Sequence, residues 1–203
     1  MRPFSDAQDF HRTSTVGNAL DRLNYRFETC FEPVRDRLAG ARVLELGSHD
    51  GRFTWAVLEH LGAAHVTGLE RDRAAIAHAE ASLAALGVAP ERFRFVAGEV
   101  EDTLPLEPPG AYDAVLNTGF LYYVHDPAGL LAALRALGAV FMLFDGHHCS
   151  TEAVLASGGG YRGQAELEAL FQRTAWAARP VDHRGGYAGY GRGTRVSYWC
   201  DAV

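Results

Sequence analysis

A carboxylate stands just ahead of a glycine turn in the segment VLELGSHDGRF, residues 43–53. Glu45 lies in a short strand-like run, and Gly47 and Gly51 let the following backbone turn sharply and approach a ligand closely. Turns of this kind often hold a pyrophosphate at a helix N-terminus. A carboxylate there would repel that group by on the order of a few kcal/mol. The pattern therefore favours a ligand that carries a positive charge or a hydrogen-bond donor.

Two further acids follow where a nucleoside would need them. Glu70 is the last residue of the second strand-like run. It follows Gly47 at close to the interval of roughly 20 residues at which an acid binds ribose hydroxyls in nucleotide-binding units. Glu99, after the third run, is placed to accept a hydrogen bond from an exocyclic amine, and Val100 can pack on a base. The alternative for Glu99 is a solvated acidic loop, because more acids follow it directly.

Side chains that could take up a proton follow the fourth and fifth strand-like runs. The segment NTGFLYYVHDP contains Tyr123 and His125, and FDGHHCS contains His147 and His148. A neutral histidine can act as a general base near neutral pH. We predict His147, His125 and Tyr123 as catalytic residues, with packing or an ordinary polar loop as the alternative. Adjacent histidines without a third ligand at a fixed spacing do not predict a metal site.

The elements that must position these residues alternate between strand and helix. Strand-like runs are predicted at residues 41–47, 64–70, 92–99, 111–119 and 138–146, with helices at 52–62, 71–87 and 127–138. This alternation indicates a parallel, doubly wound sheet, which binds ligands beyond the carboxyl ends of its strands.

The last part of the chain has a different pattern. A helix is predicted at 163–176, followed by strands at 177–184 and 194–203 joined by the glycine-rich GGYAGYGRG, which predicts an antiparallel pair. Residues up to about 40 have helical, amphipathic spacing. No long linker divides the chain, so we predict a single domain over 1–203, with 1–40 as an N-terminal helical cap.

Composition limits the function classes. The 203-residue chain has a formal net charge of −6, and all 19 of its cationic side chains are arginines spread along the sequence. Without a basic cluster, a nucleic-acid partner is not expected. No apolar run suits a signal peptide or a membrane span, so we expect a cytoplasmic protein that does not bind membranes. The three cysteines form no CxxC pair and predict neither a disulfide framework nor a zinc site.

These residues together resemble the class I S-adenosylmethionine-dependent methyltransferases. The E/D-x-G-x-x-x-G motif of that family appears as Glu45 to Gly51, its ribose acid as Glu70, and its adenine motif of the third strand as Gly98, Glu99 and Val100. The resemblance covers roughly residues 41–145, and extends to the C-terminal hairpin by topology only.

The resemblance implies a seven-stranded, mostly parallel sheet of order 3-2-1-4-5-7-6, with strand 7 antiparallel and helices on both faces. It implies S-adenosylmethionine as cofactor, whose ammonium and sulfonium groups account for Glu45, and it places Asn117 toward the methionyl group. The family commonly has a histidine after strand four where this chain has Tyr123, so the role of that histidine does not transfer directly. The predicted cofactor-binding residues are Glu45, Gly47, Ser48, Gly51, Glu70, Arg71, Gly98, Glu99, Val100 and Asn117.

The function expected from the resemblance is methylation of an oxygen or nitrogen atom of a small molecule. The partner would be that small-molecule substrate, and the sequence also allows a homodimer. Two alternatives stay open. The same cofactor site could support aminocarboxypropyl transfer or cyclisation of S-adenosylmethionine itself, or the fold could serve as a non-catalytic binding module.

Overall fold

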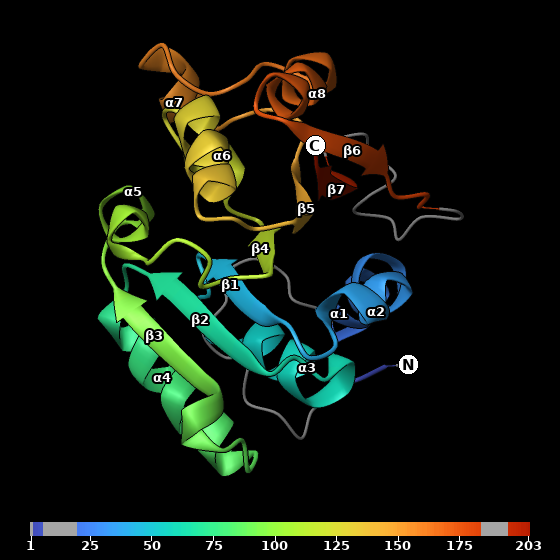
Figure 1. The fold of residues 1–203 in the computed structure, drawn as a ribbon, viewed down its shortest axis with the longest axis vertical. Helices are drawn as coiled ribbons and strands as arrows, with labels where there is room; N and C mark the ends of the chain where they lie inside the picture. Colours follow the sequence, from blue (N-terminus) through green and yellow to red (C-terminus); the bar gives the residue numbers. More distant parts are fainter. Residues whose placement is uncertain (1, 6–19, 184–194) are drawn as a thin grey trace. The chain divides into compact units, whose positions relative to one another are not determined.

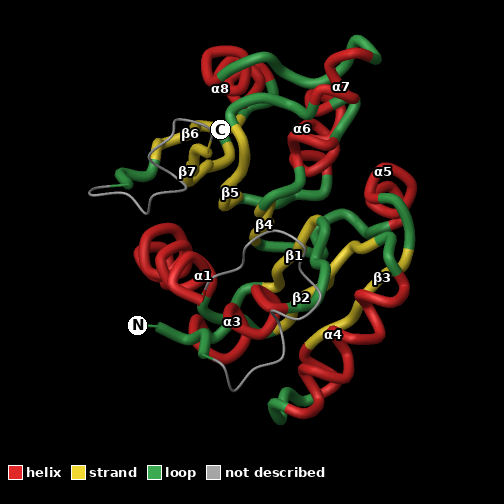
Figure 2. Tube along the Cα trace, turned by 180° about the vertical axis from the view of Figure 1, so that it is seen from behind, coloured by secondary structure: helices red, strands yellow, loops and turns green. Residues whose placement is uncertain are grey.

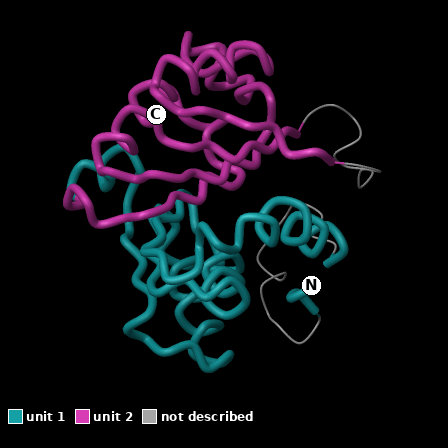
Figure 3. Tube along the Cα trace, turned by 45° about the vertical axis from the view of Figure 1, so that its right-hand side comes forward, with its two compact units in different colours: residues 1–106 teal, residues 107–203 magenta. Residues whose placement is uncertain are grey.

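The computed structural model describes residues 2–5, 20–183 and 195–203 (Figure 1). The chain divides into two compact units, unit 1 over Met1–Leu106 and unit 2 over Glu107–Val203 (Figure 3). The single domain expected from the sequence stays a prediction. No helix in the described part of the chain is long and apolar enough to cross a lipid bilayer.

The strands form a seven-stranded sheet of order β3-β2-β1-β4-β5-β7-β6. This order, and the antiparallel direction of β7 against both of its neighbours, confirm the predicted fold class. The strands are β1 (Arg42–Leu46), β2 (His65–Glu70), β3 (Phe93–Ala97), β4 (Ala114–Thr118), β5 (Phe141–His147), β6 (Trp176–Pro180) and β7 (Arg195–Ala202).

Unit 1 contains the first three strands, which pair in parallel (Figure 2). Val43 and Leu44 of β1 are fully buried, as a strand covered on both faces requires. Helices α3 (Arg52–Leu61) and α4 (Arg73–Ala85) follow β1 and β2, and both contact β2. Asp72 caps α4, since its carboxylate accepts from the amide of Ala74 at 2.8 Å. The short helix η3 (Pro90–Arg92) precedes β3, and the unit ends with α5 (Val100–Thr103) and η4 (Leu104–Leu106).

The N-terminal part of unit 1 is helical over the described residues 20–38, as predicted, while residues 6–19 of the expected cap lie outside the described residues. It consists of α1 (Leu20–Arg26), a π-helix η1 (Phe27–Phe31), η2 (Glu32–Val34) and α2 (Arg35–Leu38). Aromatic packing joins this segment to α3. The ring of Phe31 stacks on Phe53 with centroids 4.8 Å apart, and Phe4 meets both Phe53 and Phe27 edge-on.

The described part of unit 2 contains β4 to β7 and four helical segments. These are η5 (Leu121–Tyr123), α6 (Pro127–Ala136), α7 (Glu152–Ala156) and α8 (Gln164–Arg173). Its core includes Phe144, Phe171 and Tyr198, whose rings contact one another at centroid distances of 5.4 to 6.1 Å. The sequence analysis missed α7, which begins with Thr151 as its cap. β6 pairs with β7 and is the last strand of the sheet order.

Two glycines, Gly51 and Gly62, flank helix α3 and differ in how closely their surroundings pack. Gly51 and Gly62 both adopt left-handed φ values, +73° and +74°. A methyl group added to Gly62 would meet open space, but one added to Gly51 would lie 3.0 Å from Cβ of Ala79 on α4. We expect Gly62→Ala to lower the free energy of unfolding by about 1 kcal/mol, the cost of a left-handed non-glycine residue. Gly51→Ala should lower it by roughly 1–3 kcal/mol more because of overpacking.

Denaturant unfolding of the two variants measures that difference, and Gly62→Ala serves as the matched control. Equal losses of stability would show that Ala79 gives way without cost, and would remove the close approach of α4 as the reason for a glycine at position 51.

Candidate functional site

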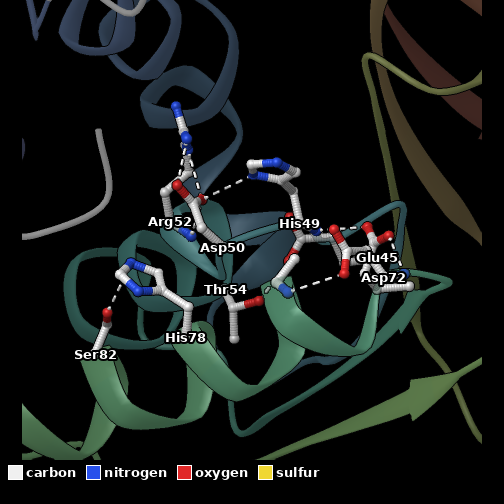
Figure 4. A network of polar contacts seen from close by, with 10 residues as sticks. Glu45, His49, Asp50, Arg52, Thr54, Asp72, His78 and Ser82 are labelled. Atoms are coloured by element: carbon white, nitrogen blue, oxygen red, sulfur yellow. Dashed lines mark hydrogen bonds and ion pairs between the residues drawn. The ribbon is translucent and has the colours of Figure 1, made fainter. Parts of the chain in front are cut away.

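Glu45 lies buried at the carboxyl end of β1, with 2% of its surface exposed. Its Oε2 accepts a hydrogen bond of 2.5 Å from the hydroxyl of Thr54, in the first turn of α3 (Figure 4). Burial raises the pKa of Glu45 to about 8, and the nearby carboxylates of Asp50 and Glu70 act in the same direction, while the Thr54 bond opposes them. The side chain is thus held inside the unit, protonated in the unliganded chain at neutral pH.

Three residues of the glycine turn have positive φ angles: +65° at Gly47, +49° at His49 and +73° at Gly51. The turn packs tightly on β2, because a methyl group on Gly68 would lie 2.5 Å from Oγ of Ser48. That hydroxyl oxygen is buried and has no hydrogen-bond partner among the described residues. The predicted residues Gly47, Ser48 and Gly51 therefore do form one close-packed turn.

Glu70, at the carboxyl end of β2, ties this turn to the next one. Its Oε2 accepts from the backbone N–H of His49, and its Oε1 accepts from the backbone N–H of Asp72, both at 2.9 Å. Each carboxylate oxygen can accept a second hydrogen bond. Glu70 can therefore hold the loop and still receive ribose hydroxyls, as predicted for it. Sequence reasoning missed its structural role, which no motif signals.

Asp50 and Arg52 form a buried ion pair inside the turn, which the sequence analysis also missed (Figure 4). Asp50 is fully buried, and its carboxylate accepts from Nε of Arg52 at 2.7 Å and from Nη2 of the same side chain. Burial would raise the pKa of Asp50, but hydrogen bonds from His49 and Arg52 and the charge of Arg52 hold it below its usual value. Asp50 in turn raises the pKa of His49.

The adenine-side residues follow β3. Val100 is buried, while the side chain of Glu99 is 55% exposed and lies 3.4 Å from Nη1 of Arg71, which is itself exposed. Gly98 has φ +154°, and a methyl group there would lie 2.7 Å from Thr103. The structure thus brings the predicted Arg71 and Glu99 together, at a solvated position of unit 1.

The role of Glu70 gives a direct test of this site. We expect Glu70→Ala to weaken binding of S-adenosylmethionine by about 1.5 to 3 kcal/mol, the range for hydrogen bonds to a charged group. Isothermal titration calorimetry measures the change. Glu80→Ala, which removes an exposed acid of α4, is the matched control and should leave the dissociation constant unchanged. An unchanged constant for Glu70→Ala would exclude Glu70 from the site.

In unit 2, Asn117 lies fully buried near the end of β4. Its side-chain oxygen accepts from the backbone N–H of Leu121 at 3.2 Å, and its Nδ2 lies 3.9 Å from the sulfur of Met142. These contacts hold the loop after β4. Its predicted role toward the methionyl group stays a prediction.

The rings of the predicted residues Tyr123 and His147 both contact the ring of Tyr122. The ring of Tyr122 meets Tyr123 at 4.4 Å and His147 edge-on at 4.7 Å between centroids. Tyr123 is 59% exposed, and the carbonyl oxygen of His147 accepts from the hydroxyl of buried Tyr161. His125 is exposed further along the same loop, where its carbonyl oxygen accepts from the amide of Gly160. The structure therefore brings Tyr123 and His147 together through Tyr122, with His125 beside them in sequence only.

Asp145 lies on β5, two residues before His147, and is fully buried. It pairs across strands with Ser197, whose hydroxyl donates to Asp145 Oδ1 at 2.8 Å. Among the described residues, no group of three or more His, Cys, Asp or Glu side chains is arranged to hold a metal ion. Tyr187, a tyrosine of the predicted hairpin tip, lies outside the described residues.

The groups of unit 1 fit a cationic nucleoside better than a pyrophosphate. Two carboxylates, Glu45 and Glu70, end neighbouring strands, and the turn between them leaves the buried Ser48 hydroxyl without a partner in the described structure. Carboxylates accept hydrogen bonds from hydroxyl and ammonium groups and attract positive charge. Glu45 and Glu70, with the turn at Gly47 and Gly51, are the residues that would hold such a ligand.

Comparison with known proteins agrees with this geometry. Residues 44–139 match the family model described as a methyltransferase domain. This match and the sheet order, which is the one implied by the resemblance to the class I S-adenosylmethionine-dependent methyltransferases, confirm the resemblance seen in the sequence. The domain implies S-adenosylmethionine as cofactor. Comparison with curated proteins gives no match.

Solved structures share the fold at low sequence identity. A structure of geranyl diphosphate methyltransferase in complex with its cofactor is 15% identical, with a TM-score of 0.67 over 91% of this chain and 87% of that one. An S-adenosylmethionine-dependent methyltransferase from Mesorhizobium loti is 15% identical, with a TM-score of 0.62 over 83% of this chain and 96% of that one. The [4+2]-cyclase SpnF is 15% identical, with a TM-score of 0.66 over 91% and 82%.

Proposed function

We propose that this chain transfers a methyl group from S-adenosylmethionine to an oxygen or nitrogen atom of a small molecule. The observation that carries the proposal is the buried carboxyl group of Glu45 at the end of β1, directly before the glycine turn. A buried acid without a charged partner is costly, and a cationic cofactor gives this one a partner. The cofactor supplies an electrophilic methyl group, so the protein has mainly to hold a nucleophile in line with it.

Tyr123, His125 and His147 are proposed as acceptor-contacting residues in unit 2. The row formed by Tyr123, Tyr122 and His147 supports this role, because it places an imidazole and two phenol rings next to one another at the end of β5 and after β4. Ligand pockets commonly combine such aromatic walls with a few polar groups. The net charge of −6 and the spread of the arginines along the sequence favour a small acceptor over a nucleic acid.

The proposal is tested by incubating the purified chain with S-adenosylmethionine and a panel of phenols, carboxylic acids and amines. Mass spectrometry then follows S-adenosylhomocysteine and methylthioadenosine, and calorimetry measures cofactor binding. Acceptor-dependent S-adenosylhomocysteine is the expected product. Absence of cofactor binding would contradict the proposal and favour a non-catalytic module.

A second function is favoured by one comparison. A [4+2]-cyclase has this fold, so the fold does not by itself require methyl transfer. In the same incubation, methylthioadenosine formed without any acceptor would support cyclisation of the cofactor instead, and methylthioadenosine formed only with an acceptor would support aminocarboxypropyl transfer.

A further inference from the structure

The hydroxyl group of Thr54 makes a different contact from those of two other threonines in helical segments. Thr54 lies in the first turn of α3 and is fully buried. The hydroxyl groups of Thr103 and Thr174 each donate to the backbone carbonyl oxygen four residues earlier, at 2.9 and 2.6 Å. Such local bonds are the usual alternative for a threonine in or near a helix. Thr54 instead donates to another element, to Oε2 of Glu45 on β1 at 2.5 Å (Figure 4).

The glycine turn brings these two side chains together. Glu45 lies one residue before the end of β1, and Thr54 is the third residue of α3, which follows the turn. Side chains of a helix lean toward its N-terminus, so Thr54 leans toward the turn and the strand end. A branched side chain has few rotamers in a helix, which limits the directions open to the hydroxyl group. Thr54 is 0% and Glu45 2% exposed, so water does not compete for the contact.

The charged groups around Glu45 oppose one another. Burial raises the pKa of Glu45, and the carboxylates of Asp50 and Glu70 raise it further. The hydrogen bond from Thr54 and the charge of Arg52 lower it. The guanidinium group of Arg52 is itself bonded to Asp50, so its charge is largely balanced there. Among the described residues, the hydroxyl of Thr54 is therefore the strongest influence in favour of the charged form of Glu45.

The hydroxyl group favours one charge state of its neighbour. An ionised carboxylate can only accept hydrogen bonds, and Thr54 has the proton to donate to it. A protonated carboxyl group can also accept that bond, but it gains less, because hydrogen bonds to charged groups are stronger than those between neutral ones. The difference corresponds to a factor of about ten in favour of the ionised form.

We propose that Thr54 is a positioning residue that controls the charge of Glu45 and, through it, the affinity for the cofactor. The inference rests on the proposed function, in which Glu45 pairs with the positive charge of S-adenosylmethionine. As the cofactor binds, Glu45 releases its proton to water. The remaining carboxylate accepts from the Thr54 hydroxyl and attracts the cation. Without the hydroxyl the proton is harder to remove, so the cofactor binds more weakly at the same pH.

The control of Glu45 by Thr54 can be tested without any cofactor. Carbon NMR of the full chain, labelled with ¹³C at the glutamate carboxyl groups, follows Glu45 as the signal that is absent from Glu45→Gln. The pKa of Glu45 is about 8 in the wild-type chain. Thr54→Val should raise the midpoint by about one pH unit, the equivalent of a tenfold change, and Thr54→Ser, which keeps the hydroxyl, should titrate like the wild type.

Thr174→Val is the matched control, because it removes a hydroxyl that bonds to the backbone of α8 in unit 2. It should leave the titration of Glu45 unchanged. If Glu45 titrates at the same pH in the wild-type chain and in Thr54→Val, the inference is overturned.

Calorimetry with two ligands separates an effect on charge from damage to the structure. S-adenosylmethionine carries an ammonium and a sulfonium group, whereas methylthioadenosine has the same nucleoside and neither charge. Near pH 6.5 we expect Thr54→Val to bind S-adenosylmethionine about tenfold more weakly and methylthioadenosine with nearly unchanged affinity. Thr54→Ser should bind both ligands like the wild type. Equal weakening of both ligands in Thr54→Val would make Thr54 a structural residue only.

A second variant keeps the test decisive. If Thr54→Val does not fold, Thr54→Ala gives the same comparison, since alanine also lacks a donor and suits a helix. A wild-type chain that binds neither ligand contradicts the proposed function, and the carboxyl titration then still decides whether Thr54 controls Glu45.

Discussion

Affinity for S-adenosylmethionine is expected to rise about tenfold per pH unit as the pH approaches 8 from below, because Glu45 must lose a proton before it can attract a cation. Burial raises the pKa of Glu45 to about 8 in the unliganded chain, so the carboxyl group is protonated at pH 6 to 7. A bound cation favours the charged form and releases that proton. Above pH 8 the gain should end, since the ammonium group of the cofactor itself begins to titrate near that pH.

Calorimetry in two buffers with different ionisation enthalpies measures the release. Near pH 6.5 the wild-type chain should release about one proton per cofactor bound. The Glu45→Gln variant should release about one proton fewer per cofactor bound, and its affinity for the cofactor should no longer depend steeply on pH. S-adenosylhomocysteine, which lacks the sulfonium charge, shows which positive group Glu45 senses. If the wild-type chain binds the cofactor but releases no more protons than Glu45→Gln does, Glu45 does not interact with the positive charge of the cofactor.

The same residue should have the opposite effect on folding of the unliganded chain. The pKa of Glu45 in the folded state lies above its ordinary value of 4.5, so its contribution to stability is fully present below pH 4.5 and is lost as pH rises to about 8. Glu45→Gln, which is always neutral, should escape this loss. We therefore expect the variant to be the more stable protein at pH 8 and the weaker binder of cofactor.

The second large effect concerns the ion pair inside the glycine turn. Asp50→Ala should lower the free energy of unfolding by about 3–5 kcal/mol, because it removes the carboxylate that accepts from two nitrogens of the buried Arg52 guanidinium. Asp50 is fully buried and the side chain of Arg52 is only 9% exposed, so water cannot replace the lost carboxylate. The pKa of Asp50 lies below its usual value of 3.8, so this stabilisation is present above that pH and is lost in more acid solution.

A double-mutant cycle measured by denaturant unfolding isolates the pair. Asp50→Ala combined with Arg52→Ala should cost clearly less than the sum of the two single changes, since the double variant leaves no unpaired charge. The exposed pair of Arg71 and Glu99, with side chains 74% and 55% exposed, is the control, and Arg71→Ala should cost at most about 1 kcal/mol. Additive losses for Asp50 and Arg52 would mean that they do not stabilise the turn as a pair.

Much of the fold was predictable because its signals are local. Apolar runs and helical patterns that end in glycine predicted the first five strands and the helices α3, α4 and α6, and the pattern of residues 163–176 predicted α8. The strand order came from the family resemblance and is confirmed. The π-helix at Phe27–Phe31 and the short α7 went unnoticed, because neither has enough turns to show a periodic pattern.

The site was predictable where a motif fixes it, and missed where contacts are long-range. Gly47 and Gly51 wind the turn that directly follows Glu45 of β1, so the motif lies between a strand and a helix as the sequence pattern predicted. Nothing in the spacing of Glu70 indicates that it binds the amide of His49, because that bond depends on how the turn folds back over β2. The bond between Asp145 and Ser197 was likewise overlooked, since only the pairing of β7 with β5 brings these two side chains together.

The end of β6 has a consequence for the protein at high concentration. β6 comes last in the sheet order, and it closes with Arg179, whose side chain is 62% exposed, and with Pro180. A proline has no amide hydrogen to offer a foreign strand, and an exposed charge on a border strand resists being covered. We expect Arg179 and Pro180 to hinder β-pairing between molecules at β6. Concentrated solutions of the folded chain should therefore not form fibrils through this strand.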